Sequence, residues 1–314
     1  DVYKRQELRT TLSDLREIKL QIGDDGRNRA FLNQFGSRTS RNQPSSTKFI
    51  FGNAKWLRSF IKPLPGHGIA YIDWGQQEFA IAAMFSGDER MLQAYQSADP
   101  YLSFAKLAGA VPEDATKESH KRERDLFKQC MLATNYGMGP SSLSEKIGES
   151  EIVSRSLLRT HQSTFPQFWR WSEDVLNFTM MNSVLQTPFG RSGRPGEKPN
   201  GRSIRNFPVQ AAGADIMRIA ACGIVEAGIK LVAPVHDAFL IEAPLQDLDD
   251  AIETTRRIMA DAGAAVLDGL RLKTDVEVMR YPDRYVDERG AKMWATVMGL
   301  LAEAKASQAG NEAG

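Results

Sequence analysis

Cysteine is scarce in this chain of 314 residues. The two cysteines, Cys130 and Cys222, cannot form a framework of several disulfides and lack the spacing of metal ligands. No apolar run approaches the roughly 18 residues that a membrane-spanning helix requires, and no signal peptide is visible. We therefore expect a globular protein of a reducing, cytoplasmic compartment without a membrane partner.

The chain also lacks a methionine at its beginning. It opens with DVYKRQ, and the first methionine is Met84. This start predicts a fragment of a longer protein, with a few non-native leading residues and with further domains upstream of Asp1.

Net charge is small as well, because 40 Lys and Arg stand against 39 Asp and Glu, which leaves +1. Total charge therefore does not indicate a nucleic-acid partner. Basic side chains are nevertheless concentrated in two segments, 121–128 and 191–205, as binding to a phosphate backbone requires. A solvated helix face and a surface loop would have the same composition, so charge alone leaves both interpretations open.

What the chain does contain is a series of strand and helix patterns, with enough length for one large domain or two interlocked ones. The predicted elements are a strand at 69–72, a helix at 76–85 ended by Gly87, mainly helices over 88–185, a loop or hairpin at 188–201, a helix at 208–228 with Pro208 in its first turn, a strand–turn–strand hairpin at 230–243, a helix at 247–266 and a strand at 272–279. The last dozen residues are rich in Ala, Gly and Glu and are predicted to be disordered.

The order of these elements predicts an α+β fold. Strands lie at both ends of a long helical insertion, so the sheet must assemble from segments that are remote in sequence. The insertion is then a helical subdomain carried by the sheet.

Two aspartates follow short apolar strands where the chain reverses or changes type: Asp73, after 69–72, and Asp237, inside the predicted hairpin. A tight turn explains the His236–Asp237 pair by itself. If the two strands are neighbours in one sheet, however, the carboxylates converge and repel, so that one must take up a proton or both must hold cations. Oxygen ligands favour Mg²⁺ or Mn²⁺, and two such ions about 4 Å apart would support phosphoryl transfer.

A second pattern places Arg124, Lys128, Leu132 and Tyr136 four residues apart. This spacing puts them in one slowly winding stripe along a helix. Two cations followed by an apolar residue and a ring suit a triphosphate at one end and a base at the other. The alternative is a surface helix whose Leu and Tyr face the core.

A third pattern repeats the spacing of four with Arg202, Asn206 and Gln210. Amide side chains can bond base edges, and the minor groove offers acceptors on every base pair, so these contacts can test the shape of a pair without reading sequence. The structural alternative is that Asn206 caps a helix ahead of Pro208.

In order and spacing, these pieces resemble the polymerase module of the DNA polymerase I family (family A). The matching motifs are DWGQQEFA (Asp73, Trp74, Gly75, Gln76, Glu78), the Arg124–Lys128–Tyr136–Gly137 pattern, TPFGR (187–191), the Arg202–Asn206–Gln210 pattern, VHD (235–237) and, weakly, SRTS (37–40). The similarity runs from about residue 36 to residue 280.

The resemblance implies the right-hand polymerase fold: a palm, with a small antiparallel sheet and flanking helices, and an inserted helical fingers subdomain. The boundaries implied are 1–65 for an N-terminal remnant that leads into the palm, 66–85 and 230–285 for the palm, 86–229 for the fingers and 286–314 for a C-terminal tail.

The activity implied is template-directed addition of deoxynucleotides to a primer 3′ end by two-metal-ion phosphoryl transfer, with release of pyrophosphate. The metal site would hold two Mg²⁺ ions, with Mn²⁺ as a possible substitute, at Asp73, Asp237 and Trp74. The partners would be primer-template DNA and deoxynucleoside triphosphates. The protein would be a monomer of bacterial or phage origin, cytoplasmic and associated with the nucleoid.

The resemblance also assigns the remaining site residues. Arg124 and Lys128 would grip the triphosphate, with Lys128 as a proton donor to pyrophosphate, and Glu78 would be a steric gate against a ribose 2′-hydroxyl. Gln76, Leu132 and Tyr136 complete the implied substrate site. The implied DNA contacts are Arg38, Arg191, Arg202, Asn206, Gln210 and His236.

Four departures from the family pattern predict a divergent branch. Ala238 stands where Glu usually follows His-Asp, Ala80 replaces the usual Arg of the first motif, and Leu132 replaces an aromatic residue. Ala211 and Ala212 stand where Gly-Thr is usual. Loss of the auxiliary Glu should lower activity without abolishing it, and loss of the ring puts sugar discrimination in doubt.

Two other functions remain open from the sequence. One is a duplex-binding protein with weak catalysis, since we expect this chain to lack an upstream thumb and any exonuclease domain. The other is a single-subunit RNA polymerase on the same scaffold, against which Glu78 argues.

Overall fold

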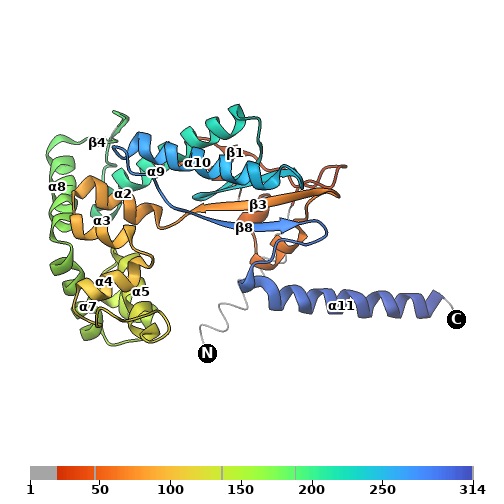
Figure 1. The fold of residues 1–314 in the computed structure, drawn as a ribbon, viewed down its shortest axis with the longest axis horizontal. Helices are drawn as coiled ribbons and strands as arrows, with labels where there is room; N and C mark the ends of the chain where they lie inside the picture. Colours follow the sequence, from red (N-terminus) through yellow and green to blue (C-terminus); the bar gives the residue numbers. More distant parts are fainter. Residues whose placement is uncertain (1–19, 46, 136, 188, 313–314) are drawn as a thin grey trace.

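A four-stranded antiparallel sheet lies at the centre of the computed structural model, which describes residues 20–45, 47–135, 137–187 and 189–312 (Figure 1). The order of its strands is β6-β7-β3-β8. Their bounds are Lys230–Val235 for β6, Ala238–Pro244 for β7, His67–Trp74 for β3 and Thr274–Arg280 for β8. Because β3 pairs with β7 on one side and β8 on the other, the sheet joins segments from both ends of the helical insertion, as the sequence predicted.

The remaining elements are mostly helices. They are α2 (Gln77–Ser86), α3 (Glu89–Gln96), α4 (Pro100–Leu107), α5 (Lys121–Asn135), α6 (Pro140–Ile147), α7 (Glu151–Thr164), α8 (Pro166–Asn182), α9 (Gly201–Glu226), α10 (Leu248–Val266), α11 (Glu288–Glu312), the 3₁₀ turns η1 (Ile50–Gly52) and η2 (Lys55–Phe60), and the short strands β1 (Leu32–Asn33), β2 (Gln43–Pro44), β4 (Leu185–Gln186) and β5 (Ser192–Gly193). This mixture of helices and small antiparallel sheets confirms the predicted α+β class. None of the described helices combines the length and apolar composition needed to cross a membrane.

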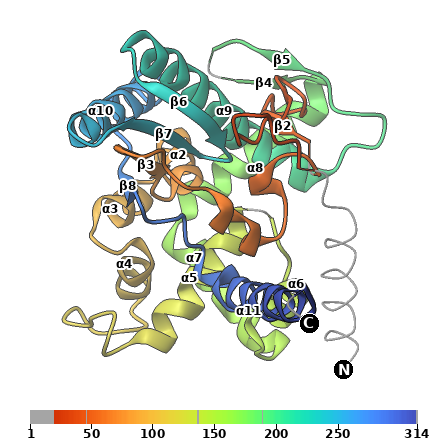
Figure 2. The same cartoon turned by 90° about the vertical axis from the view of Figure 1, so that its right-hand side faces the viewer.

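One face of the sheet is covered by long helices. Successive strand residues point to opposite faces, so Ala70, Ile72 and Trp74 of β3 share a face with Phe239 and Ile241 of β7. All five are buried in the main apolar cluster, which also includes residues of α9 and α10. Figures 1 and 2 show α9 and α10 lying along this side of the sheet.

The opposite face is apolar at one end and acidic at the other. Ile69, Leu240 and Met279 lie in a second buried cluster with Phe51 of η1 and Trp56 of η2. At the other end, Asp73 pairs across the sheet with Ala238 on β7 and with Asp275 on β8. Apolar packing at the other end of this face therefore stabilises the part of the sheet that carries Asp73.

The helical insertion between β3 and β6 is joined to the sheet through α2 and α9. Asp88 caps α3 by accepting from the Met91 N–H, and its second carboxylate oxygen accepts from the N–H groups of Gln167 and Phe168 at the start of α8. One buried carboxylate thus serves the N-termini of two helices, where a negative charge is favourable. This contact joins α3 to α8.

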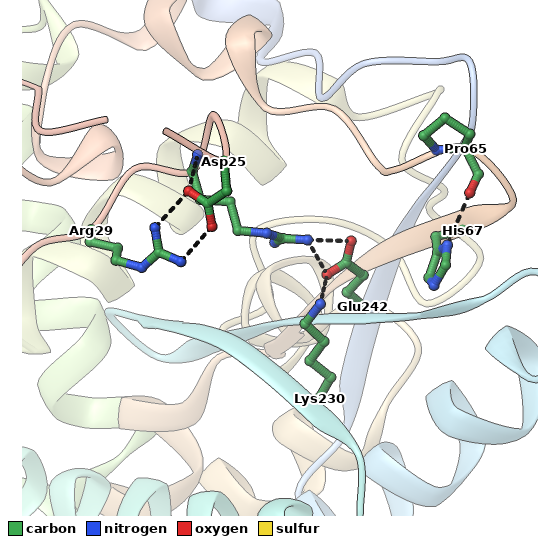
Figure 3. Close-up of polar contacts among 7 residues, drawn as sticks. Asp25, Arg29, Pro65, His67, Lys230 and Glu242 are labelled. Carbon is green, nitrogen blue, oxygen red and sulfur yellow. Dashed lines mark hydrogen bonds and ion pairs between the residues drawn. The ribbon is translucent and has the colours of Figure 1, made fainter. Parts of the chain in front are cut away.

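The segment before β1 is tied to the sheet by an ion pair on the face that carries Asp73 (Figure 3). The side chain of Glu242 on β7 is 2% exposed and lies 2.6 Å from Lys230 Nζ and 3.0 Å from Arg27 Nη2. Burial alone would raise the pKa of Glu242, but hydrogen bonds from Lys230 and Arg27 outweigh burial and lower the pKa. The negative charge is therefore retained inside the fold by two cations.

Two predictions about local structure were wrong. Helix α9 begins at Gly201 rather than at 208, because the Asn200 side chain accepts from the Arg202 and Ser203 N–H groups and starts the helix there. Pro208 lies inside the helix, next to the buried Phe207 and Val209. Packing of these neighbours outweighs the loss of one helical hydrogen bond at the proline.

The end of the chain was also predicted incorrectly. The last dozen residues were expected to be disordered, but α11 continues to Glu312. Its composition is rich in Ala, which has the highest helix propensity. Trp294 and Val297 of α11 pack against the second apolar cluster and hold the helix to the rest of the fold.

The Glu242 ion pair gives a stability prediction. Glu242→Gln removes a buried charge that faces two cations, so we expect the free energy of unfolding at pH 7 to fall by about 1–3 kcal/mol. Because the pKa of Glu242 is lowered in the folded state, the difference from wild type should shrink as the pH falls through that pKa. Urea denaturation measures both effects.

A matched control is Glu253→Gln on α10, which breaks an exposed ion pair with Arg256. This change should alter stability by no more than about 0.5 kcal/mol. Equal losses in the two variants would contradict the structural role assigned to Glu242.

Candidate active site

The structure brings the two predicted aspartates together. Strand β3 is antiparallel to β7, so Asp73 at the end of β3 meets the turn that precedes β7. The Trp74 N–H donates to the Asp237 carbonyl oxygen, with 3.2 Å between N and O. The turn at His236–Asp237 is present, and His236 adopts a left-handed conformation with φ of 54°. The turn and the convergence of carboxylates are thus one feature.

Asp73 is in an unfavourable environment for a negative charge. Burial, followed by the charges of Asp237 and Asp275, raises the pKa of Asp73 to about 7. Its Oδ1 atom is buried and has no hydrogen-bond partner among the described residues. Either a proton or a cation would relieve this strain.

Asp275 is a functional candidate that the sequence reasoning missed. It is exposed and lies directly across from Asp73 on β8, on the same face of the sheet. Glu277, two residues further, lies across from Tyr71. The signal was present in TDVEV, where acidic residues alternate with valines in a strand, but only the pairing of β8 with β3 shows which carboxylate they approach.

The side chain of Trp74 is not available as a ligand. It points to the other face of the sheet, is 1% exposed and donates its indole N–H to the Met259 carbonyl at 3.3 Å. An indole N–H has no lone pair to offer a metal ion. Only the main-chain carbonyl of Trp74 remains for the role that the sequence assigned to this residue.

The oxygen donors at this edge suit a hard divalent cation. Asp73 and Asp237 supply carboxylates and Trp74 a carbonyl, and one carboxylate oxygen is buried without a partner. In the part of the chain that the structure describes, no three His, Cys, Asp or Glu side chains are placed to hold a metal ion by themselves. Such a site fits Mg²⁺, which binds proteins through one or two carboxylates and completes its shell with substrate phosphates and water.

Helix α5 carries the predicted cationic stripe. Arg124 donates to Asp99 in a short contact and to Asp125 at 3.3 Å. The guanidinium of Arg124 and the ammonium of Lys128 lie 5.3 Å and 5.6 Å from the ring centre of Tyr101. Binding of a phosphate by Arg124 therefore requires it to exchange Asp99 for the phosphate.

Leu132 and Tyr136 are the other two members of the stripe. Leu132 lies half-buried on α5, so the helix places a short apolar side chain where the family pattern has a ring. Tyr136 lies outside the described residues. The sequence-based role of Tyr136 stays a prediction.

Gln76 links this stripe to the aspartates. It adopts a left-handed conformation with φ of 49° immediately before α2, and this conformation turns the chain from β3 into the helix. A hydrogen bond between Gln76 and Tyr101 opposes the effect of burial, which raises the pKa of Tyr101. Gln76 thus interacts with the hydroxyl of the tyrosine over whose ring Arg124 and Lys128 lie.

A cavity of about 310 Å³ lies between α2, α5 and α9. It is lined by Glu78 from α2, Thr134 from α5, and Arg202 and Asn206 from α9. The Arg202 side chain lies against Gly137, where a Cβ atom would come within 3.1 Å of Arg202 Cγ. Gln210 is half-buried further along α9 and is not among the residues that line this cavity.

Arg38, Arg191 and His236, the other predicted DNA contacts, are differently placed. Arg191 is engaged by Asp215 on α9 at 3.1 Å, whereas Arg38 is exposed and lies near Gly196. His236 is exposed at the turn beside Asp237. Surrounding protein atoms lower the pKa of His236, and Asp237 opposes this shift.

The alanines that depart from the family pattern are all in the interior. Ala80, Ala211, Ala212 and Ala238 are each 0% exposed. Ala238 pairs directly with Asp73, so this side of the aspartate has a methyl group and the other side has Asp275.

The chain is similar to known polymerases in sequence and fold. The model of DNA polymerase family A matches residues 37–281. The chain is 28% identical to the DNA polymerase of Mycobacterium phage D29, over 86% of this chain and 42% of that protein. It is 27% identical to DNA polymerase I of Chloroflexus aurantiacus, over 77% of this chain and 27% of that protein. It therefore spans less than half the length of these two relatives.

A solved structure shares the fold. It is the POL domain of Pol1 from M. smegmatis in complex with DNA primer-template and dNTP, with a TM-score of 0.73 and 20% identity, over 88% of this chain and 51% of that chain. The likeness extends over the sheet and the helical insertion alike, because it covers most of the chain.

The raised pKa of Asp73 predicts a stability effect of pH in the metal-free protein. Since the folded state keeps a proton that the unfolded state has already lost, stability falls as the pH rises from about 4 to about 7. Asp73→Asn removes this penalty. After allowance for solvent screening, we expect it to raise the free energy of unfolding at pH 8 by about 1–3 kcal/mol.

Thermal unfolding of the wild type and of Asp73→Asn, in chelator at pH 4 and pH 8, measures the gain in stability. The gain should be present at pH 8 and nearly absent at pH 4. A variant less stable than wild type at pH 8 would show that Asp73 is not under electrostatic strain.

Proposed function

Because the chain belongs to DNA polymerase family A, we propose that it adds deoxynucleotides to the 3′ end of a DNA primer as a template directs, with release of pyrophosphate. The observation that carries this proposal is the convergence of Asp73 and Asp237 at one edge of the sheet, with a buried carboxylate oxygen that has no partner among the described residues. Family membership supplies the reaction, and this edge supplies a place for it.

We assign the metal ligands to Asp73, Asp237 and the main-chain carbonyl of Trp74. Two bound Mg²⁺ ions, or Mn²⁺ in their place, would activate the primer hydroxyl and stabilise charge on the α-phosphate and the departing pyrophosphate. Asp73 has to be ionised for this role. A cation near its carboxylate favours the ionised form and so lowers a pKa that is about 7 without metal.

The triphosphate would bind along α5. Lys128 has no ion pair among the described residues, and its ammonium group is therefore ready to contact a phosphate oxygen and to donate a proton to pyrophosphate. Arg124 would join it after leaving Asp99. A triphosphate carries more negative charge than one carboxylate, and this difference favours the exchange.

The new base pair would lie near the cavity between α2, α5 and α9. Arg202 and Asn206 line this cavity, and Gln210 lies further along the same helix; all three would contact the duplex. Arg38, Arg191 and His236 would contact the DNA on either side, and Leu132 and Gln76 the bound nucleotide. Glu78 also lines the cavity, and we propose that it rejects nucleotides that carry a 2′-hydroxyl.

The subdomains follow from this assignment. We propose that residues 66–85 and 230–285 act as the palm, that residues 86–229 act as the fingers, and that 1–65 is a remnant leading into the palm and 286–314 a C-terminal tail. The protein would act as a monomer on primer-template DNA, in the cytoplasm of a bacterial cell, since the relatives named above are bacterial and phage proteins.

One observation favours a second candidate, a duplex-binding protein with weak catalysis. Ala238 stands beside Asp73 where the family pattern has a carboxylate. Primer extension with Mg²⁺ separates the two functions. Binding of primer-template without extension would favour the second, and faster use of ribonucleotides than of deoxynucleotides would favour an RNA polymerase.

The central prediction concerns Asp237. Asp237→Asn removes a metal ligand, so we expect the rate of primer extension to fall by more than about 100-fold, which corresponds to at least about 2.7 kcal/mol of transition-state stabilisation. Affinity for primer-template, measured in chelator, should change little.

Asp114→Asn, an exposed acid in the loop before α5, is the matched control and should extend primers like wild type. Near wild-type extension by Asp237→Asn would exclude Asp237 from the metal site.

A further inference from the structure

An ion pair connects Glu78 to a segment that the sequence patterns did not link to it. Nη2 of Arg41 lies 2.8 Å from Oε1 of Glu78. The carboxylate side chain is 14% exposed and the arginine side chain 35% exposed. Partial burial makes this contact stronger than a surface ion pair, because solvent screens it less.

Each member of the pair lines a cavity. Glu78 lines the cavity of about 310 Å³ that also borders Arg202 and Asn206. Arg41 lines a neighbouring cavity of about 100 Å³ together with Gln77 and His236. Glu78 follows Asp73 by five residues, through the turn at Gln76, so its distance from the metal edge is set by the β3–α2 junction.

The main chain of Arg41 is itself held in place. Its N–H donates to the Ser37 hydroxyl at 2.8 Å, and the Ser40 N–H donates to the Ser37 carbonyl at 2.8 Å. The Ser40 carbonyl accepts from Arg218 of α9. A turn at 37–41, attached to α9, therefore presents the guanidinium to Glu78.

The ion pair with Arg41 restricts the conformations of the Glu78 side chain. An unpaired glutamate samples several rotamers, and burial or pairing removes this freedom. A side chain excludes a 2′-hydroxyl only while it occupies the space that the hydroxyl needs, so exclusion depends on how firmly it is held. Leu132 provides no ring beside the sugar, which leaves Glu78 as the assigned gate among the described residues.

We propose that Arg41 is the positioning residue of the sugar gate: its guanidinium fixes the Glu78 carboxylate so that the site rejects ribonucleotides. This inference rests on the proposed polymerase function. Arg41 also neutralises a negative charge close to the path of a triphosphate, so its removal should weaken binding of both kinds of nucleotide.

The test compares incorporation of deoxynucleotides and ribonucleotides by wild type, Arg41→Ala, Arg41→Lys and Glu78→Ala. Arg41→Ala should lower the ratio of kcat/KM for deoxynucleotide over ribonucleotide by about tenfold. It should raise KM for deoxynucleotides with a smaller change in kcat. Arg41→Lys keeps the charge and should recover most of the ratio.

A double-mutant cycle separates this role from a merely structural one. Glu78→Ala should lower the ratio by itself, and adding Arg41→Ala to it should have no further effect, because the group that Arg41 positions is gone. Arg155→Ala, which breaks an exposed pair with Glu151 on α7, is the matched control and should leave the ratio unchanged.

The outcomes distinguish the inference from the function on which it rests. Absence of deoxynucleotide extension by the wild-type chain would overturn the proposed function. Extension with an unchanged ratio in Arg41→Ala, or independent effects of Arg41 and Glu78, would overturn the inference alone. If circular dichroism shows that Arg41→Ala is unfolded, Arg41→Gln, which keeps the length of the side chain without its charge, takes its place with the same expected loss of ratio.

Discussion

Repulsion between carboxylates at one end of strand β3 is the constraint on which the organisation of the site depends. Asp73 of β3, Asp275 of β8 and Asp237 of the turn between β6 and β7 converge there, and burial adds to the strain on Asp73. Packing at the other end of the same face compensates for it, since Ile69, Leu240 and Met279 lie in a buried cluster, and on the opposite face so do the central residues of β3 and β7. A sheet stabilised in this way can keep a charged edge that favours binding of a cation.

The β3–α2 junction couples this edge to the helical insertion. The left-handed Gln76 turns the chain from β3 into α2, so Glu78, in the first turn of that helix, follows Asp73 by five residues. From the other side, α9 runs from the cavity that Arg202 and Asn206 line to the neighbourhood of α10 and β6. Residues that would contact a nucleotide are therefore mounted on elements that also form the core, which limits their movement.

Several of the cations and acids at the site are held by partners within the protein. Arg124 is paired with Asp99, Arg191 with Asp215 and Glu78 with Arg41. Desolvated charges need such partners. An arginine that binds a phosphate must first leave its carboxylate partner, so binding of a substrate is linked to a local rearrangement. A pair that stays intact, as we propose for Arg41 and Glu78, instead gives the pocket a fixed shape.

The sequence by itself determined the class of fold, the long helical insertion and the two aspartates. Apolar strands before Asp73 and around Asp237 and the spacing of four on α5 and α9 are local properties, and local properties can be recognised from periodicity. The prediction was wrong about the start of α9, where packing around Pro208 outweighs the loss of a helical hydrogen bond. It was also wrong about the end of α11, where the Ala-rich composition favours a helix. Only the tertiary structure decided that Asp275 faces Asp73, that the Trp74 side chain is turned away from the metal edge and that Arg41 holds Glu78. These three facts depend on strand pairing and on contacts between remote segments. A sequence pattern within one segment does not show where another segment will lie.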